Sequence, residues 1–255
     1  MKNILLSGCG GRLGTAIAAR IAERTDCRII AGIDVQAGTA DRFTFPVHAS
    51  LAAFDGTADV VVDCSHHTVV IPLLDYCKAH HIPAVICTTG HTEEETEAIR
   101  EAAGVIPVLY SRNMSLGINL LLDLVKRATA TLGPDYNIEI VEQHHNKKLD
   151  APSGTALMLA DAAKSVREDS EYVYDRHAVR RAREENEIGI HSVRGGTIVG
   201  EHEVIFAGSD EVIRISHSAY SRDVFATGAV RAALFLTTAD RPGLYSMSDM
   251  IAAEQ

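Results

Sequence analysis

The chain has 255 residues, 46% of them hydrophobic, which fits a globular protein of one large or two modest domains and excludes a disordered or collagen-like chain. Its 24 Lys and Arg against 34 Asp and Glu give a formal net charge of −10, which argues against a nucleic-acid or membrane-surface binder, because both need a basic field. The five cysteines form no Cys-x-x-Cys pair and no run has the roughly 20 apolar residues of a membrane helix, so we expect a reduced, cytoplasmic protein without a membrane partner.

The first half of the chain alternates short apolar runs with helical patterns. Strands are expected at 4–6, 28–34, 59–63, 83–87 and 105–110, and helices at 12–24, 69–80 and 93–103. These strands are apolar on both faces and helices separate them, which predicts a parallel sheet covered on both sides.

The pattern changes after about Ser115. A long apolar helix is expected at 116–132, then a strand at 138–144 and a helix at 154–166. Three neighbouring strands at 188–193, 198–206 and 212–217 predict an open, mostly antiparallel sheet in a second, α+β domain. A last apolar helix at 224–238 is expected to return to the first domain.

The predicted fold class is therefore α/β. A Rossmann-type, parallel-sheet, dinucleotide-binding domain is expected at 1–115 plus 224–255. An inserted α+β domain with an open mixed sheet, for substrate binding and oligomerisation, is expected at 116–223.

A glycine-rich loop joins the first strand to the first helix. Its glycines permit a tight turn, and the helix start adds partial positive charge, so the loop predicts binding of a dinucleotide pyrophosphate. The spacing is Gly-x-x-Gly-x-x-Gly instead of the usual Gly-x-Gly-x-x-Gly, and Asp34, twenty residues after Gly14, can accept hydrogen bonds from ribose hydroxyls. A purely structural turn and a solvated carboxylate are the alternatives. The candidate cofactor residues here are Gly8, Cys9, Gly10, Gly11, Arg12, Leu13 and Asp34.

Cofactor choice is predicted from the residues that follow Asp34. Val35 and Gln36 bring no positive charge for a 2′-phosphate, so NADH should be accepted at least as well as NADPH, although Arg12 could approach that phosphate.

Two further loops follow parallel strands, where α/β sheets bind their ligands, and are expected on the nicotinamide side. Their candidate residues are Cys87, Thr88 and Thr89 in the first loop and Ser111, Arg112, Asn113 and Met114 in the second.

The segment 142–156 contains two histidines, two lysines and a Pro-Ser-Gly-Thr helix start. Asp150 or Ser153 can cap that helix, and Pro152 suits its first turn. The amides of Gly154 and Thr155 then point outward as anion donors, which indicates a carboxylate or phosphate cradle beside a proton donor and a fixed cation. The spacing does not fit a zinc site, so no metal is expected.

The motif His-His-x-x-Lys-x-Asp-Ala-Pro-Ser-Gly-Thr-Ala at 144–156 resembles the signature of the 4-hydroxy-tetrahydrodipicolinate reductase (dihydrodipicolinate reductase) family. The resemblance extends to the glycine loop, Thr-Thr-Gly at 88–90, Asn-Met-Ser-x-Gly-x-Asn at 113–119, Gly-Glu-His-x-Val-x-Phe-Ala at 200–207 and Ser-Arg-x-x-Phe-Ala-x-Gly-Ala at 221–229. The chain departs from the pattern at Cys87, where a glycine is expected, at 63–67, and after Asp34, where some members carry an arginine.

The resemblance implies reduction of a cyclic imine dicarboxylate by NADH or NADPH in diaminopimelate and lysine biosynthesis. It implies that His144 is the general acid and Lys148 a second donor and cation. It also implies a homotetramer held by the middle domain's sheet. The substrate-binding residues that it implies are His145, Ser153, Gly154 and Thr155.

Two alternatives remain at this stage. Another two-domain dehydrogenase, acting on an amino acid or semialdehyde, does not explain the Ser153-Gly154-Thr155 cradle. A nucleotide-sensing binding module is disfavoured by the His144 and Lys148 pair. Arg194 is a further candidate for supporting the site, and the pairs at 66–67 and 80–81 receive no role.

Overall fold

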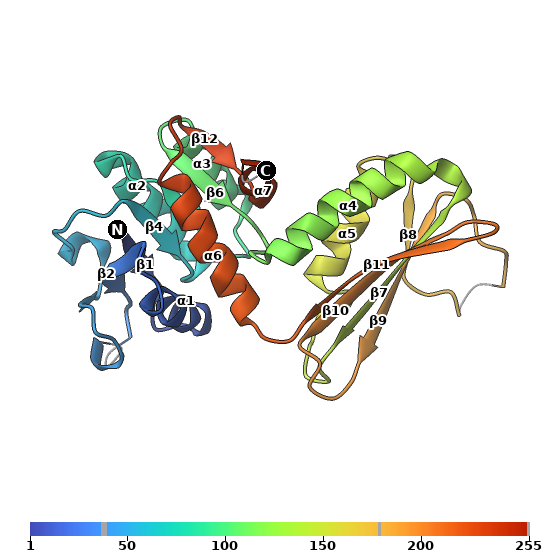
Figure 1. The fold of residues 1–255 in the computed structure, drawn as a ribbon, viewed down its shortest axis with the longest axis horizontal. Helices are drawn as coiled ribbons and strands as arrows, with labels where there is room; N and C mark the ends of the chain where they lie inside the picture. The colour runs from blue at the N-terminus through green and yellow to red at the C-terminus, as the bar shows by residue number, and fades with distance from the viewer. Residues whose placement is uncertain (37–39, 178–179, 254–255) are drawn as a thin grey trace. The chain divides into compact units, whose positions relative to one another are not determined.

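The computed structural model describes residues 1–36, 40–177 and 180–253. Its contacts divide the chain into two compact units (Figure 1). The first unit combines Met1–Leu116 with Asp223–Gln255, and the second is Gly117–Arg222. Among the described residues, no helix has both the length and the apolar character needed to cross a membrane.

The first unit is built on a seven-stranded sheet in which every pairing is parallel, as the sequence predicts for its cofactor domain. In sheet order its strands are β12 (Gly243–Tyr245), β6 (Pro107–Tyr110), β5 (Ala84–Ile86), β4 (Val60–Asp63), β1 (Lys2–Ser7), β2 (Cys27–Ile33) and β3 (Val47–His48). Its helices are α1 (Arg12–Ala22), α2 (Val70–His80), α3 (Glu93–Ala103), α6 (Asp223–Leu236) and α7 (Met247–Ala253). The short 3₁₀ helices of this unit are η1 (Ala40–Arg42), η2 (Leu51–Ala53) and η3 (His67–Val69).

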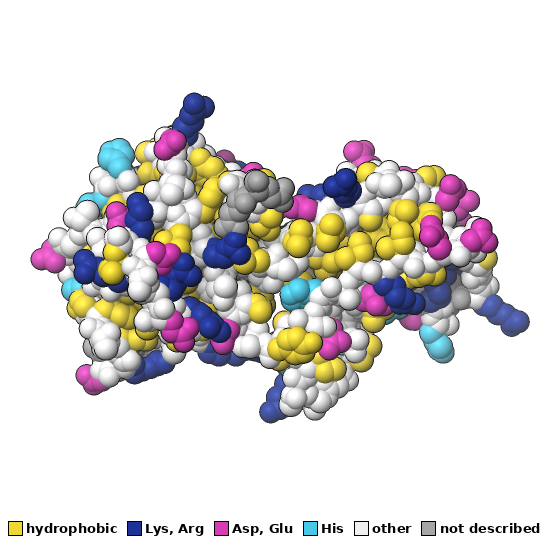
Figure 2. Space-filling view, in the orientation of Figure 1, with side chains coloured by type: hydrophobic (Ala, Val, Ile, Leu, Met, Phe, Trp, Pro, Cys, Tyr) yellow, Lys and Arg dark blue, Asp and Glu magenta, His cyan; other side chains and the backbone are white. Residues whose placement is uncertain are grey.

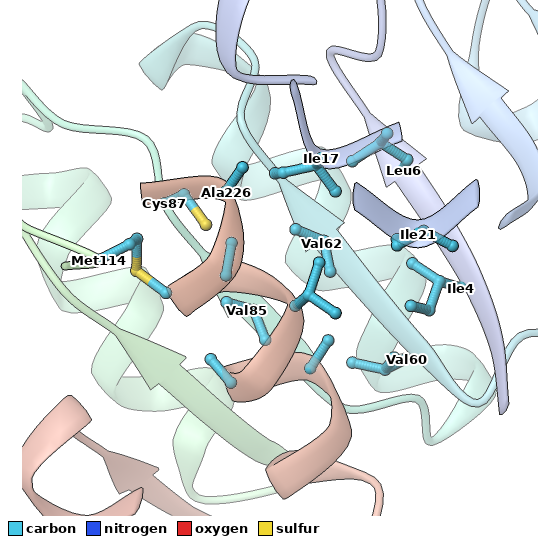
Figure 3. Close-up of a cluster of buried hydrophobic side chains, with 14 of the residues drawn as sticks. Ile4, Leu6, Ile17, Ile21, Val60, Val62, Val85, Cys87, Met114 and Ala226 are labelled. Atoms are coloured by element: carbon cyan, nitrogen blue, oxygen red, sulfur yellow. The ribbon is translucent and has the colours of Figure 1, made fainter. Parts of the chain in front are cut away.

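Helices cover both faces of this sheet, because its strands are apolar on both sides. Ile4 and Leu6 of β1 pack in one cluster with residues of α1, α6 and α7. Leu5, which points to the other face, packs with residues of α2 and α3. Figure 3 shows the first cluster, where Cys87 and Met114 lie with Ala226 of α6.

The order of the strands reverses between β1 and β4, and the loops that follow these two strands meet there. A Cβ on Gly8 would lie 2.7 Å from the Ser65 Cα atom. Open parallel sheets bind their ligands at such a switch point. The glycine loop therefore stands where a dinucleotide is expected.

The second unit carries a five-stranded mixed sheet. In sheet order its strands are β11 (Val212–Ala219), β10 (Gly200–Ala207), β7 (Asn137–His144), β9 (Glu187–Arg194) and β8 (Glu171–Val173). Helices α4 (Leu116–Leu132) and α5 (Gly154–Lys164) pack their apolar residues on one face of it, and η4 (Gly133–Asp135) follows α4.

The expectation of three neighbouring, mostly antiparallel strands was wrong for β9. This strand pairs in parallel with β7 and β8, and β10 pairs with the other edge of β7 in antiparallel orientation. The glycines at 195–196 resemble a hairpin turn between β9 and β10. However, these two strands are not neighbours in the sheet, because β7 lies between them. The connection that contains α5 is long enough to bring β9 parallel to β7.

Gly228 of α6 is expected to be indispensable for packing in the first unit. A Cβ there would lie 1.7 Å from the Met114 carbonyl oxygen. We expect Gly228→Ala to lower the free energy of unfolding by about 1–3 kcal/mol, the usual cost of overpacking, in urea denaturation. Gly195→Ala is the control, because its Cβ would meet no atom within 4 Å. Equal stability of the two variants would contradict this packing.

Candidate active site

Two glycines of the loop in the first unit, Gly8 and Gly14, have no room for a Cβ atom. Gly8 has a φ of +76°, which favours glycine. A Cβ on Gly14 would lie 2.2 Å from the Gly8 carbonyl oxygen, so helix α1 can begin against the loop only because Gly14 lacks one. Gly11, the N-cap of α1, makes no side-chain capping hydrogen bond. The start of α1 is therefore suited to an external anion.

Asp34 lies at the end of β2 beside this loop. Its Oδ2 accepts a hydrogen bond from the Gly10 amide at 2.8 Å, and its Oδ1 accepts one from the Gln36 amide at 2.9 Å. With Gly8 and Gly11 it lines a cavity of about 700 Å³. The uncapped helix start, the glycine positions and the cavity together fit a dinucleotide cofactor.

Arg42 is a cation near this site that sequence reasoning missed. Its guanidinium donates to the Gly10 carbonyl oxygen at 3.0 Å and to Thr15 Oγ1 at 2.9 Å. The sequence offers Arg12 of the glycine loop and the residues directly after Asp34 as places to look for a positive charge, whereas Arg42 belongs to η1, eight residues after Asp34.

Several predicted cofactor residues have buried side chains. Cys9, Cys87 and Met114 belong to the hydrophobic core, where burial raises the pKa of the Cys9 thiol to about 11 and that of Cys87 still further. The Thr88 hydroxyl donates to the buried carboxylate of Asp63 at 2.7 Å. These residues can face a cofactor only through their backbone.

The loop after β6, the second one expected on the nicotinamide side, is held by its own hydrogen bonds. Ser111 Oγ donates to the Asn113 carbonyl oxygen at 2.8 Å, and the Ser115 amide donates to Asn113 Oδ1 at 2.9 Å. Arg112, like Thr89 in the first loop, is exposed. Arg12 at the start of α1 is exposed, and Leu13 packs against the core.

In the second unit, the buried face of β7 changes from apolar to polar along the strand. Alternate residues are buried, first Ile138 and Ile140 and then Glu142 and His144. Because side chains of a strand alternate between faces, all four lie on the face that packs against α4 and α5. The strand thus brings two titratable groups to one end of the domain core.

Glu142 is completely buried and connects three parts of this unit. Its Oε2 is 2.5 Å from His144 Nδ1 and 2.8 Å from an Arg194 nitrogen, while its Oε1 is 2.6 Å from the second guanidinium nitrogen of Arg194. The Ser153 amide also donates to Oε1 at 3.1 Å. Burial alone would raise the pKa of Glu142, but hydrogen bonds from Arg194, Ser192 and His144 outweigh it and lower the pKa to about 2. The carboxylate is therefore ionised.

His144 is largely buried between neighbouring strands. A Cβ atom on Gly200 would lie 3.1 Å from His144 Nε2. The His144 ring also contacts the His202 ring edge-on, with 5.2 Å between the ring centroids. Burial lowers the pKa of His144 from its ordinary value, and the hydrogen bond to Glu142 opposes that shift. Burial lowers the pKa of His202 to about 4, so His202 is neutral near pH 7.

Lys148 and His145 lie in the loop after β7. Lys148 Nζ forms an ion pair with Asp150 at 2.8 Å. His145 Nδ1 is buried and makes no hydrogen bond to any residue that the structure describes. The predicted cation, which is paired with Asp150, and the predicted ligand-binding imidazole thus lie in the same loop.

The start of α5 differs in part from its prediction. Ser153 is the N-cap, and its Oγ accepts the Ala156 amide at 3.1 Å, so Asp150 is not the cap and Pro152 precedes the helix rather than beginning it. The Ser153 side chain is 2% exposed and also contacts His202 Nε2 at 2.9 Å. Its hydroxyl therefore holds the helix start in place and is not a surface donor. At Gly154, by contrast, a Cβ would meet no atom within 4 Å, so the helix start opens onto free space.

Figure 2 shows basic and acidic side chains interspersed on the visible face, as the acidic composition leads one to expect. Within residues 1–36, 40–177 and 180–253, no group of three or more His, Cys, Asp or Glu side chains could hold a metal ion.

Three site residues received little or no weight from the sequence. Glu142 and His202 belonged to recognised motifs but had no role, and Arg194 was only a candidate. The alternation of side chains along the strands could have indicated them, because residues that pair across neighbouring strands lie on the same face of the sheet. His202 pairs with Glu142, and Arg194 pairs with His144.

Comparisons with known proteins match both halves of the chain. The family model described as "Dihydrodipicolinate reductase, N-terminus" matches residues 2–114, and the one described as "Dihydrodipicolinate reductase, C-terminus" matches residues 117–251. A 4-hydroxy-tetrahydrodipicolinate reductase from Caldanaerobacter subterraneus is 50% identical over 252 residues, and one from Clostridium novyi is 44% identical over 252 residues; each alignment covers 98% of both chains.

Solved structures have the same fold. A dipicolinate-bound dihydrodipicolinate reductase from Paenisporosarcina sp. TG-14 has a TM-score of 0.82 at 24% identity, covering 96% of this chain and 97% of that one. A probable dehydrogenase from Thermotoga maritima has a TM-score of 0.65 at 13% identity, covering 98% of this chain and 93% of that one.

Proposed function

The chain belongs to the dihydrodipicolinate reductase family, and from that premise we propose which of its residues carry out each part of the reaction. The reaction is the reduction of 4-hydroxy-tetrahydrodipicolinate to tetrahydrodipicolinate with a nicotinamide cofactor, in diaminopimelate and lysine biosynthesis. The amino-acid dehydrogenase and the nucleotide sensor, left open by the sequence, are set aside, because the family matches span both halves of the chain.

The first unit holds the cofactor. The pyrophosphate binds against the Gly10-Gly11-Arg12 segment at the start of α1, and Asp34 accepts hydrogen bonds from the adenosine ribose. Because the Gly10 amide donates to Asp34 and the Gly11 amide to the Gly8 carbonyl oxygen, the Arg12 amide and the partial positive charge of the helix start carry this contact. The carboxylate keeps lone pairs for this purpose, since the Gly10 and Gln36 amides use only part of its capacity. The reduced nicotinamide supplies the hydride for the reaction.

We expect NADH to be used at least as well as NADPH, because a 2′-phosphate beside Asp34 would meet like charge. Arg42, held at Gly10 and Thr15, is the cation that makes NADPH acceptable at all. Arg42→Gln should therefore lower kcat/KM for NADPH by about tenfold, within the range for a hydrogen bond to a charged group, and change NADH much less. Steady-state kinetics with both cofactors checks this. A tenfold advantage for NADPH in the parent enzyme, or equal losses for both cofactors in the variant, would contradict it.

The second unit holds the dicarboxylate substrate. The Gly154 and Thr155 amides and the Thr155 hydroxyl bind one carboxylate at the open start of α5, with His145 beside them. Ser153 is buried and stabilises this helix start by capping α5 through its hydroxyl oxygen. The dipicolinate-bound relative supports a ligand of this class, because dipicolinate is a planar ring with two carboxylates.

His144 is the general acid, and Lys148 is a second donor and cation. Reduction of the conjugated ring leaves negative charge that a proton must neutralise, and an imidazole titrates in the right range. The observation that carries this proposal is the buried His144–Glu142 pair, which the Ser153 amide joins to the start of α5.

The proposal is tested by the pattern of inhibition. Pyridine-2,6-dicarboxylate should inhibit competitively against the substrate but not against NADH, because the two anions occupy separate helix starts. Competition with NADH alone would place the dicarboxylate at the glycine loop and contradict the assignment.

We also propose that the enzyme is a cytoplasmic homotetramer with the mixed sheet at its contacts. The face of this sheet opposite α4 and α5 bears apolar side chains, and Val193 and Val212 on it are 44% and 52% exposed. Analytical ultracentrifugation should give four times the chain mass, and a monomer would contradict the proposal.

A further inference from the structure

Glu142 occupies a position where the fold alone would favour an apolar residue. It continues the buried row of Ile138 and Ile140 on β7, and its side chain is 0% exposed. A buried carboxylate is costly unless hydrogen bonds compensate it. Here both oxygens are occupied, by Arg194, His144 and the Ser153 amide.

Arg194 fixes the orientation of the Glu142 carboxylate, and His144 shares the Oε2 atom with it. Arg194 binds both carboxylate oxygens in a bidentate pair, and a further hydrogen bond from the same guanidinium to the Asp150 carbonyl oxygen, at 2.7 Å, fixes its position. The carboxylate cannot rotate without breaking this pair. Its Oε2 therefore stays directed at His144 Nδ1.

We propose that Glu142 is the positioning residue of His144: it accepts the Nδ1 proton, so that Nε2 is the atom that exchanges a proton with the substrate, and Arg194 holds the carboxylate in that orientation. This inference rests on the proposed role of His144 as the general acid. The ionised Glu142 carboxylate can only accept hydrogen bonds. A neutral His144 must therefore carry its proton on Nδ1 to keep the hydrogen bond to Glu142.

The groups that face His144 determine the direction of its pH response. Glu142 on its own strand favours the protonated ring, whereas Arg194 on β9 and Lys148 in the following loop disfavour it. His202 on β10 is neutral near pH 7. Removing the Glu142 charge must therefore lower the pKa of His144. Because a general acid works only while protonated, the decline of kcat/KM at high pH should then move to lower pH.

Glu142→Gln tests this, and Glu139→Gln is the matched control. Glu139 lies on the same strand and is also paired with an arginine, Arg183, and a histidine, His191, but on the opposite face. We expect Glu142→Gln to lower kcat about ten- to a hundredfold, by analogy with the carboxylate partners of metal-binding histidines. The alkaline limb should shift downward and KM should stay nearly unchanged. Glu139→Gln should leave kcat and the pH profile as in the parent.

An unchanged kcat and an unmoved alkaline limb in a folded Glu142→Gln enzyme would overturn the inference. In that case a large loss of kcat in His144→Gln would leave the proposed function standing, whereas a normal kcat in His144→Gln would overturn the proposed function as well.

A measurement on the parent protein covers the case in which Glu142→Gln does not fold. ¹⁵N–¹H spectra of the histidine rings at high pH, assigned with His144→Gln, should show His144 protonated at Nδ1 and bare at Nε2. Protonation at Nε2 would overturn the inference.

Discussion

Replacing His144 with Gln is expected to lower kcat by about 10²–10⁴, the usual contribution of a general acid. Gln keeps a polar side chain of similar reach but cannot deliver a proton, so the substrate must be protonated from water. NADH affinity should be nearly unchanged, because the cofactor residues belong to the other unit of the chain. Lys148→Ala should also lower kcat with NADH affinity intact, since the second donor and cation are lost.

The measurement is steady-state kinetics together with NADH titration of each variant. His80→Gln serves as the control, since the contacts of this exposed histidine, a stacked Tyr76 ring and the Tyr76 carbonyl oxygen, are within its own helix. If His144→Gln and Lys148→Ala both keep a near-normal kcat, neither residue is the proton donor.

Replacing Thr155 with Val is expected to weaken pyridine-2,6-dicarboxylate binding about ten- to a hundredfold. Val keeps the shape of Thr but lacks the hydroxyl, and a hydrogen bond to a charged group contributes about 1.5–3 kcal/mol. The backbone amides at the start of α5 remain in place, so binding should be weakened rather than abolished. Pyridine-2-carboxylate, which lacks one carboxylate, should be less sensitive to the change if it binds through its other end.

Calorimetric titration of the parent and variant with both ligands checks this. Thr131→Val on α4 is the control, because its hydroxyl only donates to the Arg127 carbonyl oxygen one turn earlier. If Thr155→Val binds the dicarboxylate as tightly as the parent, the start of α5 is an ordinary capped helix and the cradle assignment is wrong.

Local patterns of the sequence were sufficient for most of the fold. The predicted helices at 93–103 and 116–132 coincide with α3 and α4, because a capping box of Thr92 and Glu95 and a long amphipathic pattern define them locally. The short strands β3, β8 and β12 were not predicted, since two or three residues carry too little periodicity unless a clear apolar run marks them, as it does for β5. The seven-residue helix α7 was not predicted either. The place of β9 beside β7 is set by a tertiary crossover, which the hairpin-like glycines at 195–196 do not reveal.

The candidate site shows the same division between local and tertiary information. The glycine loop and the segment 142–156 could be found by motif, because their residues are neighbours in the sequence. Arg42 and Arg194 reach their partners Gly10 and Glu142 across 32 and 52 residues, so only the fold brings them together. The burial of Ser153 could not be predicted, because a helix start looks the same from sequence whether its cap is buried or exposed.

The most direct test of the account is turnover of the substrate itself. In a coupled assay, pyruvate and aspartate semialdehyde are condensed to form 4-hydroxy-tetrahydrodipicolinate, and NADH loss is followed after adding this protein. The account predicts NADH oxidation that depends on the coupling enzyme, on both precursors and on His144. Oxidation no faster than the background without this protein would contradict it.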